Sequence, residues 1–195
     1  SIMELIIHRI NTLKKLKKIP LKYGVEVDLR SRNSKIILSH NLGNNHDKFS
    51  NYLENYKHGT IILNIKESGI EKEVIKMVKS YKVKSYFLLD VEMPYIFTSY
   101  KKNKKIAIRF SQYEDISIAK NFINKLDWLW IDTVTKLPIN KKNISIISKF
   151  KSCLVCPERW GRIKDIKKYK NFMKKLNFYP TAVMTNKKCI RLWEN

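Results

Sequence analysis

Short apolar runs alternate along the chain with longer segments in which apolar side chains recur every three to four residues. Runs of this length are typical of buried β-strands, and the intervening period is that of amphipathic helices. Eight runs stand out, at 4–7, 25–28, 60–65, 86–90, 105–110, 128–132, 153–156 and 181–185. Eight apolar strands separated by helical segments predict a parallel sheet.

The helical segments complete the pattern. They are expected at 11–20, within 41–56 after a polar loop, and at 67–82, 93–102, 113–126, 137–150 and 163–176. Asn11 or Thr12 is the predicted N-cap of the first helix, and Pro138 is expected in the first turn of the helix at 137–150.

At this strand count the first choice of fold is a compact (β/α)₈ barrel of TIM type that forms one domain over residues 1–195. Because 195 residues fall below the roughly 250 of a typical barrel, short helices and loops are expected. An open doubly wound sheet is the alternative. It would normally carry a glycine-rich turn after the first strand, and none is present.

Chemistry-bearing residues gather at the first two strands. Side chains alternate faces along a strand, so Glu26, Asp28 and Arg30 share one face of the second run. Two carboxylates on one face repel each other unless a cation, an arginine or a shared proton lies between them, which makes a hard-metal site the leading interpretation. His8 follows the apolar run at 4–7, and His40 ends a further extended apolar segment at 35–40. Two histidines, an arginine and two carboxylates suit metal-assisted phosphoryl chemistry.

These residues resemble a known family. His8-Arg9, Asn11-Thr12, Glu26-x-Asp28 and His40 resemble, in order and spacing, the motif of the glycerophosphodiester phosphodiesterases, in the superfamily of the phosphatidylinositol-specific phospholipases C. The resemblance implies that His8 and His40 are the catalytic acid and base. It also implies that Arg9 holds phosphate oxygens and that Glu26 and Asp28 bind Mg²⁺, Ca²⁺ or Mn²⁺.

The chain departs from the family pattern at three places. Ile10 replaces the usual glycine after His-Arg, and Asn41 replaces the usual acid after the second histidine. The third strand of the family usually carries Glu-x-Lys, whereas this chain has Asn64 and Lys66. We expect Asn64 as the third metal ligand, with lower affinity because an amide oxygen brings no charge, unless another acid such as Asp90 or Glu92 substitutes.

Further substrate-binding candidates lie at later strand ends, where barrels of this type hold their active sites. Lys66 and Arg109 are candidates for phosphate oxygens; an ordinary solvated lysine and a pairing of Arg109 with Glu26 or Asp132 are the alternatives. Glu158 and Trp160 belong to the unusual segment 157–162, which is either a substrate loop or a tight turn at Gly161.

Composition narrows the class of partner. The net charge of +23 raises the encounter rate with anionic substrates and membrane surfaces. Nucleic acid is an unlikely partner, because the lysines are scattered and neither an aromatic RNA-binding signature nor finger spacings are present. No apolar run is long enough to span a bilayer and the start reads directly into a strand, so the expected compartment is the cytoplasm.

The sequence therefore predicts a metal-dependent phosphodiesterase that hydrolyses a small glycerol- or polyol-phosphate diester. By resemblance alone, such a compact member is associated with bacterial surface polysaccharides. The alternative is a catalytically degenerate barrel that binds a phosphate ligand or nucleic acid, motivated by Asn64 and by the charge.

Overall fold

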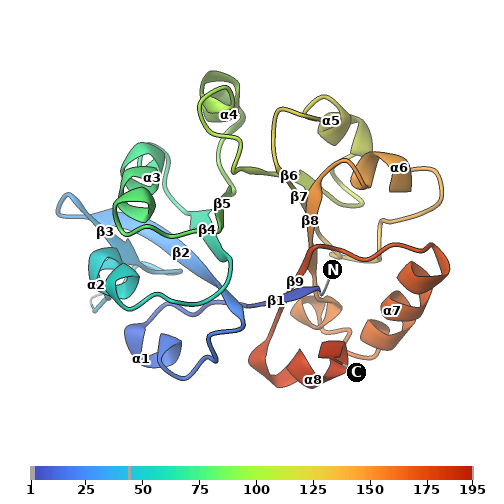
Figure 1. Ribbon diagram of the computed structural model, residues 1–195, viewed down its shortest axis with the longest axis horizontal. Coiled ribbons are helices and arrows are strands. Elements are labelled where there is room, and N and C mark those ends of the chain that lie inside the picture. Colours follow the sequence, from blue (N-terminus) through green and yellow to red (C-terminus); the bar gives the residue numbers. More distant parts are fainter. Residues whose placement is uncertain (1–2, 44, 195) are drawn as a thin grey trace. The chain divides into compact units, whose positions relative to one another are not determined.

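The computed structural model describes residues 3–43 and 45–194. The chain divides into two compact units, one over residues 6–99 and one over residues 1–5 and 100–195. Each unit is a parallel sheet with helices between its strands (Figure 1). The prediction of a single domain over residues 1–195 stays a prediction.

The unit over residues 6–99 has the strand order β5-β4-β2-β1, and β3 pairs with β2. The first strand, β1, begins before this unit and pairs with β2 through Ile6 and Ile7. The elements are β1 (Glu4–Ile7), α1 (Leu13–Leu16), β2 (Gly24–Arg32), β3 (Lys35–Leu38), α2 (Phe49–Glu54), β4 (Ile61–Ile65), α3 (Glu71–Ser80), β5 (Tyr86–Leu89) and α4 (Met93–Ser99). Figure 1 shows α1, α2 and α3 packed around these strands.

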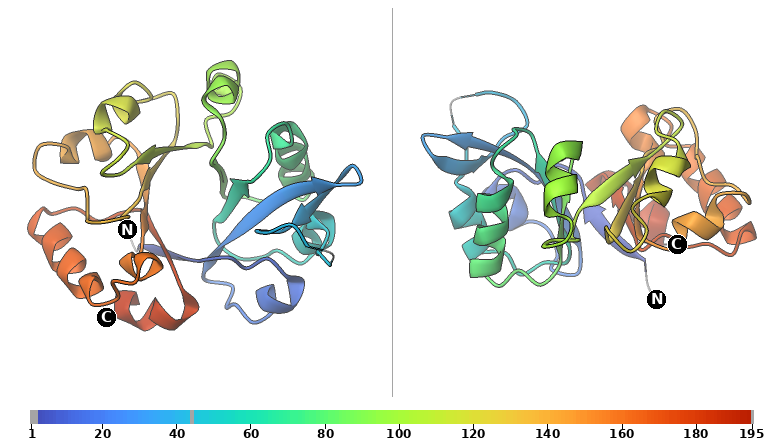
Figure 2. Two further views of the ribbon diagram at one scale, coloured as in Figure 1. Left: turned by 180° about the vertical axis from the view of Figure 1, so that it is seen from behind. Right: turned by 90° about the horizontal axis from the view of Figure 1, so that it is seen from above.

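The unit over residues 1–5 and 100–195 has the strand order β9-β8-β7-β6, with all neighbours parallel. Helices α5 to α8 surround these strands in the views of Figure 2. The elements are β6 (Ala107–Phe110), α5 (Ile116–Lys120), β7 (Trp128–Ile131), α6 (Ile144–Ile147), β8 (Lys151–Val155), η1 (Pro157–Trp160), α7 (Asp165–Lys175), β9 (Ala182–Thr185), η2 (Lys187–Cys189) and α8 (Ile190–Glu194).

All eight predicted strands form, and the reason is burial. Val25, Val27 and Leu29 of β2 are fully buried, as are Ile61, Ile62 and Leu63 of β4. Strands that are covered on both faces need apolar residues at nearly every position, which makes them stand out in a sequence.

The extended segment expected at 35–40 forms β3, which turns back from β2 and pairs with it in antiparallel orientation. Strand β2 is longer than the predicted run at 25–28. Residues Asn33 and Ser34 form the turn with φ of 49° and 58°, the pair of positive values that a two-residue hairpin requires. The register pairs Leu29 with Leu38. The hairpin thereby returns the chain to the level of Asp28.

Several helices are shorter than predicted. Thr12 is the N-cap of α1, as one of the two predicted alternatives, but α1 ends at Leu16. The helix predicted at 137–150 begins only at Ile144, so Pro138 lies in a loop. The side chains of Asn140 and Asn143 each accept a backbone hydrogen bond from the other residue and hold a turn there, which competes with the helix.

Candidate active site

The carboxyl end of β1 delivers His8 and Arg9. Arg9 has a left-handed backbone with φ of 53°, and its N–H donates to Glu26 Oε2 over 2.8 Å. His8 Nε2 lies 3.8 Å from the same oxygen. A hydrogen bond from Ile10 N to the Glu26 carbonyl closes the turn at 2.9 Å. The turn therefore holds both predicted residues against the Glu26 carboxylate.

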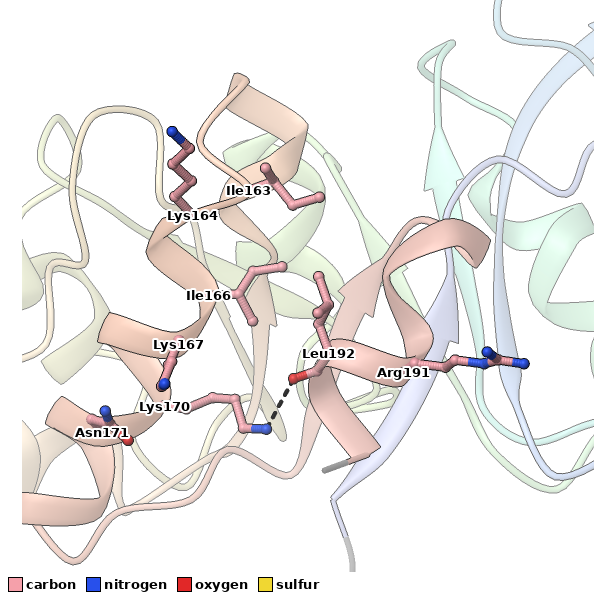
Figure 3. A pocket seen from close by; sticks show the side chains of 8 residues that line it. All are labelled: Ile163, Lys164, Ile166, Lys167, Lys170, Asn171, Arg191 and Leu192. Atoms are coloured by element: carbon pink, nitrogen blue, oxygen red, sulfur yellow. Dashed lines mark hydrogen bonds between the residues drawn. The ribbon is translucent and has the colours of Figure 1, made fainter.

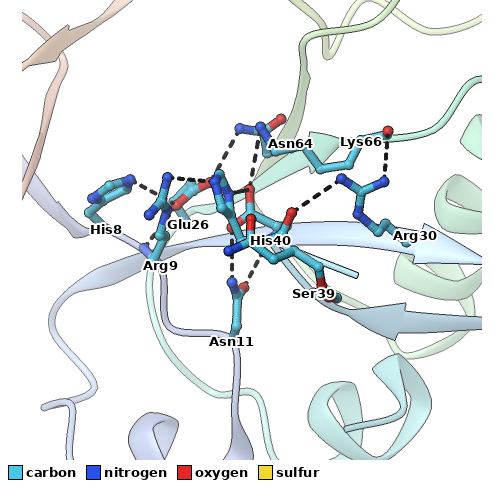
Figure 4. A network of polar contacts seen from close by, with 11 residues as sticks. His8, Arg9, Asn11, Glu26, Arg30, Ser39, His40, Asn64 and Lys66 are labelled. Carbon is cyan, nitrogen blue, oxygen red and sulfur yellow. Dashed lines mark hydrogen bonds and ion pairs between the residues drawn. The ribbon is translucent and has the colours of Figure 1, made fainter. Parts of the chain in front are cut away.

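Strand β2 places Glu26 and Asp28 side by side in the interior, each 1% exposed. The parallel register with β4 pairs Asp28 with Asn64, and Asn64 Nδ2 donates to Glu26 Oε1 at 3.3 Å. Asn11 binds Asp28 twice: its Nδ2 donates to Oδ2 and its Oδ1 accepts from the Asp28 N–H, both at 2.9 Å. Figure 4 shows the side chains of Asn11, Glu26 and Asn64 in this cluster.

The two carboxyls differ in ionisation. Burial, and then the charge of Asp28, raise the pKa of Glu26 from 4.5 to about 8. Burial also opposes the ionisation of Asp28, but its hydrogen bonds to Asn11 and His40 and the charge of Lys66 hold its pKa below the ordinary value. Near neutral pH the pair therefore carries one negative charge, on Asp28, and keeps one proton, on Glu26.

His40 reaches this pair from the end of β3. Its neighbour Ser39 donates a backbone hydrogen bond of 2.9 Å to the Asp28 carbonyl, which fixes the place of His40. His40 Nδ1 lies 3.3 Å from Asp28 Oδ1, and His40 Nε2 accepts from Arg9 Nη2 over 2.8 Å. A guanidinium can only donate, so Nε2 carries a lone pair and Nδ1 carries the proton that faces Asp28.

Lys66 and Arg30 complete the polar network. Lys66 Nζ lies 3.6 Å from Asp28 Oδ1. Arg30 donates to the main-chain carbonyls of His40 at 3.1 Å and of Lys66 at 3.4 Å. Figure 4 shows Arg30 between these two carbonyls. Arg30 therefore links the segment that carries His40 to the segment that carries Lys66.

A divalent cation would find oxygen donors in this cluster. Asn64 Oδ1 is buried and has no hydrogen-bond partner among the described residues, and the carboxyls of Asp28 and Glu26 lie beside it. Carboxylate and amide oxygens are ligands that Mg²⁺ and Ca²⁺ accept, so the set fits a hard cation. Within residues 3–43 and 45–194, no group of three or more His, Cys, Asp or Glu side chains could hold a metal ion. Asp90 and Glu92 are exposed, and Glu92 accepts from Ser68 instead.

The other predicted substrate residues lie in the unit over residues 1–5 and 100–195. Arg109 Nη2 donates to Asp132 Oδ2 at 2.9 Å, which is the alternative pairing foreseen for it. Trp160 Nε1 donates to Asp132 Oδ1 at the same distance, and the indole is 38% exposed. The buried Asp132 thus holds one exposed aromatic ring and one guanidinium at the ends of β6, β7 and β8.

Glu158 has a different surrounding. Its Oε1 accepts from the Asn186 N–H at 2.6 Å and from the Thr185 hydroxyl at 3.3 Å, and its Oε2 accepts from the Arg159 N–H. These contacts tie η1 to the end of β9. The substrate role predicted for Glu158 stays a prediction.

Sequence reasoning missed two members of the polar cluster. Asn11 was seen only as a helix opener, and Arg30 only as a residue on the face of the two acids. The signal for Arg30 was available, since it follows Asp28 by two positions on a strand whose polar side chains share a face. The contacts of Arg30 depend on where β3 and β4 run, and those of Asn11 depend on how the segment after β1 lies against β2. The sequence gives neither.

No family model and no curated protein matches the sequence. Among solved structures, the chain is similar to the crystal structure of a glycerophosphoryl diester phosphodiesterase from Parabacteroides distasonis ATCC 8503. The match has a TM-score of 0.64 and 9% sequence identity, and covers 94% of this chain and 82% of that chain.

An identity this low shows the fold alone. It confirms the predicted fold class, an α/β fold of TIM type with eight parallel strands and helices between them. The structural match is to a protein of the family that the motif residues resemble. In fold, the chain is a TIM-type α/β protein that resembles the glycerophosphodiester phosphodiesterases.

Proposed function

We propose that this protein is a metal-dependent phosphodiesterase that hydrolyses a small glycerol- or polyol-phosphate diester. The observation that carries the proposal is the convergence of His8, Arg9, His40 and Lys66 on the buried pair Glu26 and Asp28. Two histidines, two cations and two carboxylates within hydrogen-bond or ion-pair distance are what general acid–base attack on a phosphate ester requires.

Arg9 and Lys66 hold the substrate phosphate in this mechanism. Their side chains supply the cationic donors of the cluster, and a guanidinium matches two phosphate oxygens at once. In the free protein Arg9 occupies the lone pair of His40 Nε2. An incoming phosphate attracts the guanidinium by charge, and the movement of Arg9 frees that nitrogen.

His40 is then the general base. Its Nδ1–H faces Asp28 Oδ1, so Asp28 orients the ring and stabilises the imidazolium that forms when Nε2 takes a proton. The nucleophile is a water, or a substrate hydroxyl beside the phosphate that forms a cyclic phosphate, which a water then opens to the phosphomonoester. His8, beside Glu26, protonates the leaving alcohol oxygen. The cycle ends when the two histidines exchange their protons with solvent.

Glu26, Asp28 and Asn64 are the residues that would hold a cation. When bound, a divalent ion would neutralise charge that develops on the phosphate oxygens. Only two of the three donors are acids, and one of them keeps a proton near neutral pH, so binding releases a proton from Glu26. The affinity should therefore rise with pH.

The identity of the two alcohol groups of the diester is less constrained than its phosphate. Trp160 and Arg109, held by Asp132, offer a ring face and a cation of the kind that bind a sugar or glycerol group. A polyol or sugar substituent on the diester, and a role in bacterial surface polysaccharide metabolism, are proposed from the family resemblance alone. Glu158 is the remaining proposed substrate contact.

The test is release of phosphomonoester from a panel of glycerophosphodiesters by protein supplied in turn with Mg²⁺, Mn²⁺ and Ca²⁺. His8→Ala and His40→Ala should each lose at least about 100-fold in turnover, the usual contribution of a general acid or base. His46→Ala is the matched control, because His46 contacts only the Gly43 carbonyl at 2.7 Å among the interactions described for it. Turnover equal to that of the wild type in all three variants would refute the mechanism.

A catalytically degenerate barrel is the second candidate, favoured by the amide at Asn64 and the contact between Arg9 and His40. It predicts that no diester in the panel is hydrolysed, while a diester still binds and Arg9→Ala removes that binding. Calorimetry on the same samples separates the two candidates.

A further inference from the structure

A cleft of about 450 Å³ lies between α7 and α8 (Figure 3). No residue of the candidate active site lines it. Its lining consists of Ile163, Lys164, Ile166, Lys167, Lys170, Asn171, Arg191 and Leu192.

The charge of the cleft has one sign. Lys164, Lys167, Lys170 and Arg191 line it, and none of its described lining residues is acidic. Asp165, the acid of α7, forms an ion pair with Arg162 at 3.1 Å. The Lys170 ammonium donates to the Leu192 carbonyl at 2.9 Å and so holds α8 beside α7. Four cationic groups gathered on one hollow surface attract an anionic partner.

The cleft also exposes aliphatic side chains. Ile163 is 48% exposed and Leu192 is 45% exposed, whereas Ile166 between them is buried and forms the floor. Figure 3 shows the basic side chains of α7 and Arg191 around these aliphatic groups. Exposed apolar groups rimmed by charged ones are typical of an interaction surface.

We propose that the α7–α8 cleft docks the chain onto an anionic lipid surface. Lysines and arginines near such a surface gain attraction from acidic headgroups, while exposed aliphatic side chains enter the boundary between headgroups and acyl chains. Nucleic acid fits this cleft less well, because its lining has no aromatic ring on which a base could stack. The proposal does not depend on the phosphodiesterase activity.

Docking of this kind needs no membrane-spanning segment. In the described part of the chain, no helix is long and apolar enough to cross a membrane. Peripheral binding by a few basic and aliphatic side chains is reversible and sensitive to salt, since its electrostatic part extends only over a Debye length.

The test is sedimentation of the full chain with vesicles of phosphatidylcholine alone or with 30% phosphatidylglycerol. Combined Lys164→Ala, Lys167→Ala and Arg191→Ala should reduce the partition coefficient for the acidic vesicles on the order of 100-fold. The matched control, Lys101→Ala, Lys102→Ala and Lys141→Ala, removes the same charge from exposed positions outside the cleft and should cost less than about tenfold. Lys170 is kept because it positions α8.

A second variant tests the aliphatic contribution. Ile163→Ser with Leu192→Ser should weaken binding to acidic vesicles about tenfold and leave its salt dependence unchanged. Circular dichroism and melting temperature, which should match the wild type, show that the exposed substitutions leave the fold intact.

Three results would overturn the proposal. Equal losses in the two charge variants would assign binding to the net charge of +23 instead of the cleft. No effect of the serine variant would exclude insertion. Tighter, cleft-dependent binding to an acidic helical peptide or to duplex DNA than to acidic vesicles would assign the cleft to a macromolecular partner.

Discussion

The buried carboxyl of Glu26 gives the stability of this protein a specific dependence on pH. Burial, reinforced by the charge of Asp28, raises the pKa of Glu26 from 4.5 to about 8. An acid whose pKa is higher in the folded state binds its proton more tightly there, so the free energy of unfolding falls as pH rises between the two values. Below pH 4.5 the group is protonated in both states and has no effect.

The magnitude follows from the width of this window. Each pH unit between the two pKa values is worth about 1.4 kcal/mol for one proton. From pH 5 to pH 7, Glu26 should therefore lower the free energy of unfolding by roughly 2 to 3 kcal/mol. The pKa of Asp28 is lower in the folded protein than its ordinary value of 3.8. Asp28 therefore adds to the free energy of unfolding above pH 3.8, and this stabilisation is lost only as the pH falls below that value. It does not affect this window.

Glu26→Gln should remove the effect. A neutral amide replaces the protonated carboxyl. Asn64 Oδ1 is buried and has no hydrogen-bond partner among the described residues, while Asn64 Nδ2 faces residue 26. If the Asn64 amide exchanges the positions of its oxygen and nitrogen, the N–H of the new glutamine can donate to Asn64 Oδ1. In the absence of metal, the variant should be roughly 2 to 3 kcal/mol more stable than the wild type at pH 7 and about equal to it near pH 5.

The assay is urea denaturation at pH 5, 6, 7 and 8 with a chelator, and then with millimolar Mg²⁺ or Ca²⁺. Added cation should restore the stability of the wild type at pH 7 and 8 and leave Glu26→Gln unchanged, since the cation competes with the proton of Glu26. Glu54→Gln, at the exposed end of α2, is the matched control. Parallel pH profiles of the wild type and Glu26→Gln in chelator would refute the reasoning.

Three further predictions follow from single contacts. Asn64→Asp restores a third carboxylate, so Ca²⁺ binding measured by calorimetry should tighten about tenfold, while stability in chelator falls; unchanged affinity would exclude Asn64 as a ligand. Arg30→Ala frees the carbonyls of His40 and Lys66 and should lower kcat about 10- to 100-fold with KM nearly constant, and Arg30→Lys should recover part of it; a change in KM alone would contradict this positioning role. Ser34→Gly should raise the free energy of unfolding by about 0.5 to 1 kcal/mol, because φ is 58° at this turn position; a loss of stability in urea would contradict it.

The strands of this fold could be predicted from the sequence, because strands that are buried on both faces consist of continuous apolar runs. The helices were less predictable, because most are short and depend on local polar groups. At 137–150 the periodic isoleucines indicated a long helix, yet the side chains of Asn140 and Asn143 bind the backbone and delay its start to Ile144. Competition of this kind is decided by a few hydrogen bonds and leaves no periodic signal.

The candidate site, like the fold, could be predicted from the sequence only in part. The alternation of side chains along β2 was enough to aim Glu26 and Asp28 at one place, because both lie on a single strand. The position of His40 depends on the register of the hairpin from β2 to β3. Apolar and polar residues alternate too weakly along these strands to fix that register from the sequence. The contacts of Asp132 with Arg109 and Trp160 join three separate strand ends, and only the structure reveals which of the possible partners is chosen.

The replacement of a third carboxylate by Asn64 has a consequence for the whole cluster. Three buried carboxylates repel one another strongly unless a cation or protons compensate their charge. Here one acid is paired with Lys66 and His40, the other keeps a proton, and the amide of Asn64 donates to it. The cluster can therefore fold and persist without metal. Metal binding then becomes a reversible step that competes with one proton, which is why the pH profile of Glu26 is the most direct measurement of whether this site takes up a cation.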